Sequence, residues 1–281
     1  MSALTGKTIV ITGGTSGIGE AAAIELAKQG ARIVLVARSQ KRASATLKKL
    51  YPAGEHAVHY ADLSTLAEMK RAGAEIAAAE EKIDVLINNA GAMFDRRRET
   101  ADGLEQTFAV NHMAYFVLTH LLLARVQAAA PSARIINTSS AMHRSGRLDF
   151  DDLQLLRGYS PWTAYSNSKL CNVLFTRALA RRLTGSGMAV NAVHPGLVNS
   201  RFGDDSGPLL GPAFRAVKLG GLTPAQGAKT IVWLAAAPET ATLTGGYYER
   251  CAPGEVSPAA QDDAAGDRLW AESARIAGLS A

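Results

Sequence analysis

Two short apolar runs, separated by a glycine-rich turn and a helical stretch, stand near the N-terminus of the chain. The runs are 7–12 (KTIVIT) and 32–37 (RIVLVA), and their β-branched residues predict buried parallel strands. Between them lie four glycines in seven residues and a helical stretch, 20–29, which Gly30 ends. A strand, a helix and a second parallel strand form a right-handed crossover. The chain is thereby restricted to folds in which helices cover a parallel sheet.

The same alternation continues to the end of the chain. Further strands are predicted at 57–61, 83–87, 134–138 and 189–193, and a short one near Tyr247 and Tyr248. Helices are predicted at 40–50, 66–80, 104–129, 165–183 and 225–236. We therefore expect an α/β fold over residues 1–281, a single-domain Rossmann-type doubly wound parallel sheet of about seven strands with helices on both faces. In such sheets, ligands bind at the carboxyl ends of the strands.

Composition narrows the class of protein further. The chain has 281 residues, 47% of them hydrophobic, which is ample for one large core. The net charge of +5 suits an anionic small molecule and does not indicate nucleic acid. Cys171 and Cys251 show neither metal spacing nor a redox pair, so no metal site is predicted. With no signal peptide, and with a longest apolar run, 113–126, too short to span a bilayer, we expect a cytoplasmic protein without an integral membrane segment.

Two stretches interrupt the alternation, at 142–163 and 199–222. The second is rich in glycine and proline and carries apolar residues such as Phe202 and Phe214. Long connections in compact domains are commonly lids or binding loops, so we interpret 199–222 as a substrate loop for a lipophilic molecule. The alternative is a tolerated insertion. The tail, 258–281, is predicted to carry a surface helix at 262–277.

The turn after the first strand is typical of a phosphate-binding loop. Its spacing, Gly13-x-x-x-Gly17-x-Gly19, lets the backbone turn tightly and approach a pyrophosphate at a helix N-terminus. The second strand ends in Arg38, where an NAD site would carry a carboxylate for the adenosine ribose. Because a guanidinium can pair with a 2′-phosphate, we predict NADP(H) over NAD(H). The alternative is an ordinary surface arginine.

Tyr165 and Lys169 lie four residues apart in a predicted helix, so their side chains share one face. A free tyrosine has a pKa near ~10, too high for proton transfer at neutral pH. A neighbouring ammonium stabilises the phenolate and lowers this pKa. The pair is therefore a candidate acid/base unit, and the alternative is two surface residues one turn apart.

Several short motifs follow one another in a fixed order, each at a predicted strand end or helix position. They are Thr12-Gly13-x-x-x-Gly17-Ile18-Gly19, Asp62-Leu63, Asn88-Asn89-Ala90-Gly91, Asn111, Ser139-Ser140, Tyr165-x-x-x-Lys169 and Pro195-Gly196. In this order the chain resembles the short-chain dehydrogenase/reductase family. The stretches that begin at Val110 (VNHMAYFVLTHLLL) and Ala164 (AYSNSKLCNVLFTRAL) look most like its retinol-dehydrogenase-like and protochlorophyllide-reductase-like branch.

The resemblance implies catalytic roles for Asn111, Ser140, Tyr165 and Lys169. Tyr165 would be the general acid in carbonyl reduction and the base in alcohol oxidation, with Lys169 lowering its pKa and holding the nicotinamide ribose. Ser140 would bind the substrate oxygen. Its neighbour Ser139 is the alternative, and only one of the two can serve, because alternation along a strand points them to opposite sides. Asn111 would interrupt its helix and hold a water that links Lys169 to solvent.

The resemblance also implies a set of cofactor contacts and an assembly. The cofactor residues would be Gly13, Thr15, Ser16, Gly17, Ile18, Gly19, Arg38, Asp62, Leu63, Asn89, Ala90, Gly91, Tyr165, Lys169, Pro195, Gly196, Val198 and Ser200. Ser200 stands where the family often has threonine. Members often form a homo-dimer or homo-tetramer through the helices that hold Asn111 and Tyr165.

These observations predict an NADP(H)-dependent oxidoreductase that transfers a hydride between nicotinamide and a small-molecule carbonyl or alcohol. Two other functions stay open. An NAD(P)-dependent epimerase or dehydratase uses the same fold, although the region after Pro195 is short for its substrate domain. A non-catalytic NADP-sensing protein would be marked by a damaged Tyr165–Lys169 pair, which this chain does not have.

Overall fold

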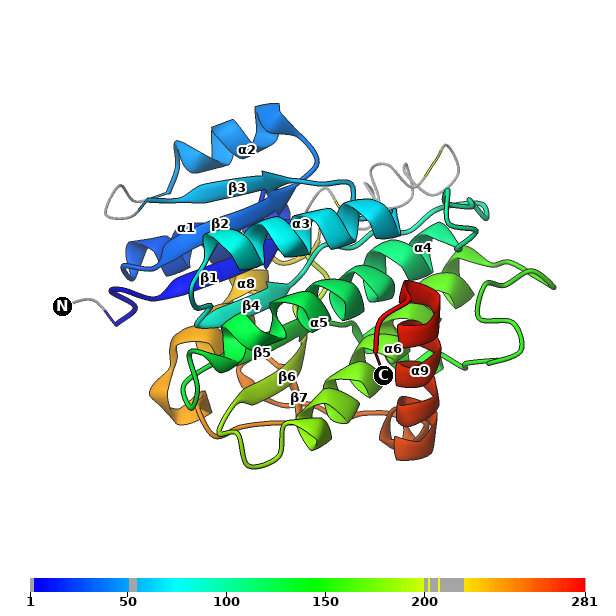
Figure 1. Ribbon diagram of the computed structural model, residues 1–281. Coiled ribbons are helices and arrows are strands. Elements are labelled where there is room, and N and C mark those ends of the chain that lie inside the picture. The colour runs from blue at the N-terminus through cyan, green and yellow to red at the C-terminus, as the bar shows by residue number, and fades with distance from the viewer. Residues whose placement is uncertain (1–2, 51–54, 200–201, 203–206, 208–219, 281) are drawn as a thin grey trace.

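The computed structural model describes residues 3–50, 55–199, 202, 207 and 220–280. Its sheet has the strand order β3-β2-β1-β4-β5-β6-β7-β8, and every pairing is parallel except the last (Figure 1). The strands are β1 (Thr8–Thr12), β2 (Arg32–Ala37), β3 (Ala57–Tyr60), β4 (Val85–Asn88), β5 (Arg134–Thr138), β6 (Ala189–His194), β7 (Tyr247–Glu249) and β8 (Ala252–Pro253). The predicted doubly wound sheet is confirmed, with β8 as a two-residue addition at one edge.

Helices cover both faces of the sheet. The α-helices are α1 (Gly17–Lys28), α2 (Gln40–Leu47), α3 (Leu66–Ala79), α4 (Gln106–Phe108), α5 (Ala114–Gln127), α6 (Pro161–Arg182), α8 (Pro224–Ala236) and α9 (Asp263–Ala277). Short helical turns are η1 (Ala109–Met113), η2 (Ala141–Ser145), η3 (Pro238–Thr240) and η4 (Pro258–Gln261). In Figure 1, α3, α5 and α6 lie on one face, and α1 and α8 lie behind the sheet.

The apolar strands are explained by burial on both faces. Ile9 and Ile11 of β1 face the layer of α1 and α8, whereas Val10 between them faces the layer of α3 and α5. A strand covered on both sides needs apolar residues at every position, which is why the sequence shows continuous runs instead of alternation. The sheet is therefore packed on both faces, and this packing fixes the positions of its strand ends.

Helix starts follow the capping residues. The Thr223 hydroxyl accepts a hydrogen bond from the Gln226 N–H, and the Gln226 side-chain oxygen accepts one from the Thr223 N–H, so α8 begins with a complete capping box. Thr65 caps α3 and Asp262 caps α9 with one bond each, accepted from the N–H three residues further along. Gly278, with φ at +59°, ends α9 in the left-handed conformation. The predicted bounds of these helices are thus confirmed to within one or two residues.

The long predicted helix at 104–129 is not uniformly α-helical. Between α4 and α5 the chain forms a π-helical turn, η1, which contains Asn111. Together these elements form a helix, Gln106–Gln127, long and apolar enough by composition to cross a membrane, with 72% of its most apolar window buried inside the protein. The sequence argument considered only the run 113–126, and the helix that contains this run is longer than the run itself. Burial against the sheet is what marks it as a core helix.

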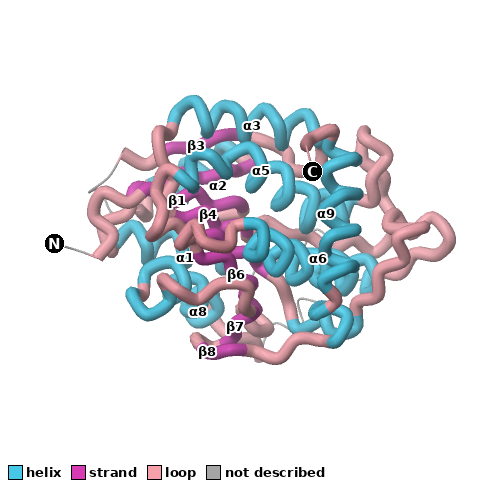
Figure 2. The backbone as a smooth tube through the Cα atoms, turned by 60° about the horizontal axis from the view of Figure 1, so that its bottom comes forward, coloured by secondary structure: helices cyan, strands magenta, loops and turns pink. Residues whose placement is uncertain are grey.

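The C-terminal helix α9 packs against α6 and α5 rather than lying loose on the surface. The Trp270 ring contacts Phe116 and Phe175, at centroid distances of 5.1 and 5.8 Å, and the Arg182 guanidinium lies over the ring at 4.3 Å from its centre. Figure 2 shows α9 running alongside α6. The predicted helix is confirmed, but its inner face, including Leu269, belongs to the main core.

Most of the predicted substrate loop, 199–222, lies outside the described residues. Its two ends are paired. The Asn199 N–H donates to the Leu222 carbonyl oxygen at 2.8 Å, and the Leu222 N–H donates to the Leu197 oxygen at 2.8 Å. Val198 and Leu222 thereby form a parallel bridge. The segment between these residues starts and ends at one place beside β6.

Candidate active site

Thr12, the last residue of β1, ties together the carboxyl ends of the two central strands. Its hydroxyl oxygen accepts hydrogen bonds from the N–H groups of Asn89 (2.9 Å) and Ala90 (3.0 Å), which follow β4. The Asn89 side chain donates back to the Thr12 carbonyl oxygen at 3.1 Å. The segment after β4 is thus held against the glycine turn after β1.

The glycine turn is built for close approach of backbone. Gly13 has φ at +68°, and a Cβ placed on it would lie 2.9 Å from the Ala90 Cα. A Cβ on Gly19 would collide with the Gly13 carbonyl oxygen and the Asn89 side chain. Helix α1 starts at Gly17, and its N-cap, Ser16, makes no side-chain hydrogen bond to the first turn. The free N–H groups of this turn fit a phosphate group.

Arg38 and Asp62 stand at the ends of β2 and β3, on the same edge of the sheet. Both side chains are exposed, and within the described part of the chain Arg38 has no ion-pair partner. Asp62 accepts a hydrogen bond from the Ser64 N–H at 3.1 Å, and the next residue, Leu63, is buried. The guanidinium and one carboxylate oxygen are therefore available at the edge where a dinucleotide would bind.

Lys169 carries a buried ammonium. The residue is 2% exposed, its Nζ donates to the Thr138 carbonyl oxygen at 3.1 Å, and it lies 5.5 Å from the centre of the Tyr165 ring. A Cβ on Gly91 would lie 3.6 Å from this nitrogen, so the segment after β4 forms its other wall. Burial lowers the pKa of Lys169 to about 7. The predicted spacing of Tyr165 and Lys169 does bring the two side chains together.

Tyr165 has a pKa shifted opposite to the sequence expectation. Burial raises its pKa to about 12, and a hydrogen bond with the Ser140 side chain acts in the other direction but is the smaller effect. The expected lowering by Lys169 is therefore wrong for this structure, because burial disfavours the phenolate and also lowers the pKa of the lysine. At neutral pH the hydroxyl is protonated, as a general acid must be.

The two serines after β5 have different surroundings. The buried Ser139 hydroxyl donates to the Lys169 carbonyl oxygen at 2.8 Å. The half-buried Ser140 interacts with Tyr165 and accepts a hydrogen bond from the Met142 N–H at 3.2 Å. Of the two, Ser140 is the residue whose hydroxyl lies on the Tyr165 side.

Asn111 sits inside the π turn, with its amide fully engaged. The Oδ1 atom accepts from the Ala92 N–H at 2.7 Å, and Nδ2 donates to the Ala92 oxygen and to Ser168 Oγ, both at 2.9 Å. Single π turns inside α-helices are frequent at functional sites. The side chain thus connects the segment after β4 to α6, whereas the expected water link to Lys169 stays a prediction.

Pro195, Gly196 and Val198 follow β6 at the same edge of the sheet, and Val198 is buried. Ser200 lies outside the described residues. Phe202 is described, and its ring lies 5.3 Å from that of Tyr165. The one described part of the predicted substrate loop that comes near the site therefore contributes an aromatic side chain to it.

A family model described as short chain dehydrogenase matches residues 7–208 of this chain. The chain belongs to the short-chain dehydrogenase family. Human "Retinol dehydrogenase 13" is 41% identical over 290 residues, which cover 99% of this chain and 86% of the relative. The chain thus falls in the retinol-dehydrogenase-like branch and is an oxidoreductase acting on alcohol or carbonyl groups.

Solved structures agree with this assignment. An uncharacterized protein from Mycobacterium Paratuberculosis superposes with a TM-score of 0.78 at 31% identity, covering 98% of this chain and 95% of its own. A Pseudomonas aeruginosa structure titled "RhlG/NADP active-site complex" has a TM-score of 0.69 at 28% identity, covering 87% and 94%. Members of the short-chain dehydrogenase family use NAD(P)(H), and the glycine turn of this chain fits that cofactor.

Some residues of this short-chain dehydrogenase support the site without having been assigned a role from the sequence. Thr12 is one. Tyr115 is another, because its hydroxyl donates to the Ala90 oxygen at 2.9 Å and its ring lies 5.8 Å from Lys169 Nζ. The signal for Thr12 is a polar residue at the end of an apolar strand run. Tyr115 lies within an apolar helix and gives no such signal.

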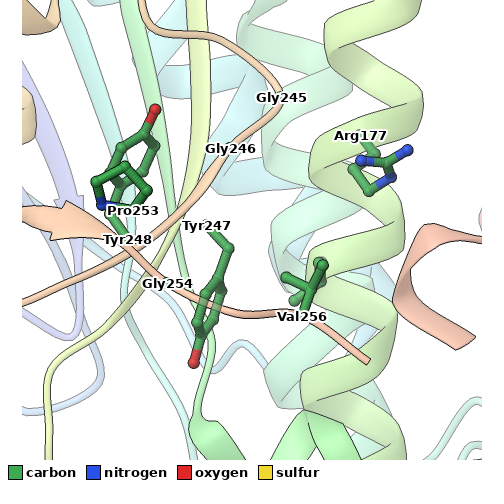
Figure 3. A pocket seen from close by; sticks show the side chains of 9 residues that line it. Arg177, Gly245, Gly246, Tyr247, Tyr248, Pro253, Gly254 and Val256 are labelled. Atoms are coloured by element: carbon green, nitrogen blue, oxygen red, sulfur yellow. The ribbon is translucent and has the colours of Figure 1, made fainter. Parts of the chain in front are cut away.

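A separate pocket of about 220 Å³ lies between α6 and the β7–β8 turn (Figure 3). Arg177 from α6 and Tyr247 from β7 line it, and Tyr165 and Lys169 do not. The Tyr247 ring also contacts that of His143, with ring centres 4.8 Å apart, and His143 Nδ1 donates to the Ser140 carbonyl oxygen at 2.8 Å. Tyr247 thus lines this pocket and also contacts His143, which holds the Ser140 carbonyl oxygen. Within the described residues, no cluster of His, Cys, Asp and Glu could hold a metal.

Proposed function

We propose that this short-chain dehydrogenase is an NADP(H)-dependent enzyme that interconverts a lipophilic alcohol and its carbonyl compound. The observation that supports the proposal most is the meeting of three side chains at one edge of the sheet. Tyr165 lies beside Ser140, and the Lys169 ammonium lies 5.5 Å from the Tyr165 ring. These are the groups needed to hold an oxygen and to move a proton to or from it.

In the reducing direction, Tyr165 donates its proton to the substrate oxygen, and Ser140 holds that oxygen by a hydrogen bond. In the oxidising direction, the Tyr165 phenolate accepts the alcohol proton. A bound nicotinamide dinucleotide supplies or accepts the hydride. Lys169 stabilises the phenolate that each proton transfer leaves behind or requires, and its burial strengthens that interaction because little water screens it.

The cofactor is proposed to bind along the ends of β1, β2, β3 and β4. The turn at Gly13 and the start of α1 would hold the phosphates, and Asp62 and Leu63 would lie beside the adenine. Arg38 would pair with a 2′-phosphate, which NAD does not have. The exposure of Arg38 and its lack of a partner within the described residues support NADP(H) over NAD(H).

The substrate is proposed to be lipophilic, as the name retinol dehydrogenase implies for the relative. The Phe202 ring lies 5.3 Å from that of Tyr165. Large apolar side chains are also exposed on the segments after β6 and at the start of α6, where Leu197 is 54% and Trp162 is 51% exposed. An aromatic side chain against the reacting tyrosine favours an apolar molecule with a single reactive oxygen. The cytoplasmic location expected from the sequence stays a prediction.

A panel of aldehydes that includes retinal, followed by NADPH absorbance, tests the proposal together with the Tyr165→Phe variant. We expect the variant to bind NADPH normally and to lose about a hundredfold or more in turnover, because it lacks the acid. Tyr248→Phe, on the opposite face of the sheet, is the matched control and should retain its turnover. Full turnover by Tyr165→Phe, or turnover of sugar nucleotides instead of aldehydes, contradicts the proposal.

A further inference from the structure

His143 lies in the η2 turn, three residues after Ser140, and is completely buried. Its Nδ1 atom lies 2.8 Å from the Ser140 carbonyl oxygen, which can only accept, so Nδ1 carries a hydrogen. On the other side of the ring, the Ser257 N–H donates to Nε2 at 3.4 Å, so Nε2 carries none. One neutral tautomer satisfies both contacts, and burial, which lowers the pKa of His143, favours the same neutral form.

The Ser140 carbonyl oxygen accepts two hydrogen bonds from His143. The backbone N–H of His143 donates to it at 3.0 Å, and the ring occupies the second lone pair. The Ser140 hydroxyl oxygen accepts from the Met142 N–H at 3.2 Å, which leaves its own hydrogen to donate to a substrate oxygen. His143 and Met142 thereby hold both polar groups of the serine, its carbonyl and its hydroxyl.

The η2 turn gains a support from outside its own backbone through the His143 ring. It is a 3₁₀ helix of five residues, and hydrogen bonds in such helices have poorer geometry than those of an α-helix. The ring is itself held by Ser257 and by the Tyr247 ring of β7, whose centre lies 4.8 Å away. Gly254 packs closely against Tyr247, since a Cβ on it would lie 2.8 Å from that ring. The His143 ring is thus fixed by two later segments of the chain.

We propose that His143 is a positioning residue that holds Ser140 at the reaction centre through the hydrogen bond from its ring to the Ser140 carbonyl oxygen. The inference rests on the proposed function, in which Ser140 binds the substrate oxygen. Ser257, 114 residues further along the chain, takes part in fixing the serine because it holds the other nitrogen of the same ring.

The expected effect is on turnover rather than on cofactor binding. Carbonyl reduction places negative charge on the substrate oxygen in the transition state, and a hydroxyl stabilises this charge only from the right position. A Ser140 that has lost one of its two carbonyl bonds is held less firmly in that position, so kcat falls. The KM for NADPH should not change, because neither His143 nor Ser140 is among the proposed cofactor contacts.

Three substitutions of His143 separate its two ring contacts. The amide nitrogen of His143→Asn takes the place of Nδ1 and keeps the donor to Ser140, whereas the amide of His143→Gln takes the place of Nε2 and keeps only the contact with Ser257. His143→Phe keeps a ring against Tyr247 and removes both bonds. We expect kcat for carbonyl reduction to fall about tenfold in the phenylalanine and glutamine variants, the size of one lost hydrogen bond, and to stay near wild type in the asparagine variant. The glutamine variant serves if the phenylalanine variant does not fold.

The Ser140→Ala background tests whether His143 acts through Ser140. If it does, His143→Phe should lower kcat no further in that background, because the hydroxyl that it positions is gone. Arg144→Ala is the matched control. Arg144 is the next residue of η2 and donates to the Glu255 carbonyl oxygen at 3.1 Å, so its removal cuts another bond between η2 and the same C-terminal segment. The bond from His143 to Ser140 stays in place, and Arg144→Ala should retain its kcat.

A purely structural role of His143 would lower the thermal midpoint of its variants and give the same loss of kcat with and without the Ser140 hydroxyl. That result overturns the inference, as does an equal loss of kcat in His143→Asn or Arg144→Ala. A loss in His143→Phe and His143→Gln that disappears in the Ser140→Ala background supports it. Failure of the proposed function looks different, because Ser140→Ala and Tyr165→Phe would then themselves keep wild-type turnover.

Discussion

Arg38 is an exposed cation at the end of β2 that has no partner in the described part of the chain. Its removal should therefore affect ligand binding and leave folding unchanged. We expect Arg38→Ala to raise the KM for NADPH by about ten- to a hundredfold, the value of one charge-assisted contact to a phosphate. The KM for NADH should stay nearly constant. Initial rates with both cofactors measure the difference.

Arg42, one turn further along in α2, is the control for Arg38. Its backbone N–H bonds the Ser39 cap, and its side chain carries the same charge a few residues away. Arg42→Ala should leave the ratio of the two KM values unchanged. An equal rise for NADPH and NADH in Arg38→Ala, or a wild-type preference for NADH, contradicts the NADP(H) assignment.

At the scale of single residues, the sequence predicted which side chains meet but not how burial changes their acidity. The spacing of Tyr165 and Lys169 correctly predicted that the side chains meet, because helix geometry fixes which residues share a face. It predicted the wrong direction for the pKa of Tyr165, because a spacing carries no information on burial. Ser139 and Ser140 could not be separated from the sequence either. Their difference depends on the Lys169 carbonyl, which approaches Ser139 only after α6 has packed on the sheet.

Among the elements, the junction of β1 with the segment after β4 depends on one hydroxyl. Thr12→Val keeps the shape of the side chain and leaves the N–H groups of Asn89 and Ala90 without their acceptor. We expect the free energy of unfolding to fall by about 2–4 kcal/mol, the cost of two unpaired backbone donors. Urea unfolding measures this loss, and NADPH affinity should fall with it because the same segment is proposed to line the cofactor.

Thr12→Ser keeps the oxygen and loses only a methyl group. It should cost about 1 kcal/mol and retain most of the NADPH affinity. If the valine variant is as stable as the serine variant, the hydroxyl does not hold the two strand ends together.

Elements were predictable where a local signal marks them. The strands ended where apolar runs end, and α3, α8 and α9 began at capping residues. The π turn at Asn111 has no local signal in the residue pattern, and its interruption of the helix was expected only from the family resemblance. It exists because the Asn111 amide is held by Ala92 and Ser168, two residues far away in the sequence.

For the whole molecule, the position of α9 determines which helices can form an interface with a second copy of the chain. The family resemblance left the oligomeric state open, since members often assemble through the helices of Asn111 and Tyr165. In the structure, Trp270 and Leu269 of α9 pack onto those helices. We therefore expect no dimer through this face, and sedimentation velocity should find the mass of one chain over the micromolar range. A dimer that dissociates when Trp270 is replaced by alanine contradicts this expectation.

The position of α9 could not be read from the tail sequence. Its apolar residues predict a helix with one buried side, but they do not say which part of the protein the helix covers. That choice depends on Phe116 and Phe175, which belong to other helices and form an aromatic cluster with Trp270. The overall sheet was predictable because each strand is marked by its own apolar run. The docking of a terminal helix depends instead on residues far away in the sequence.

The bridge between Val198 and Leu222 has a consequence for how such an enzyme can change over generations. Both ends of the intervening stretch leave the framework at one point, so insertions, deletions and exchanges between them need not displace β6 or α8. If this stretch selects the substrate, as the sequence predicts, substrate preference and cofactor binding can then vary independently. A duplicated gene could acquire a new preference by grafting a single stretch of chain while inheriting its redox chemistry intact.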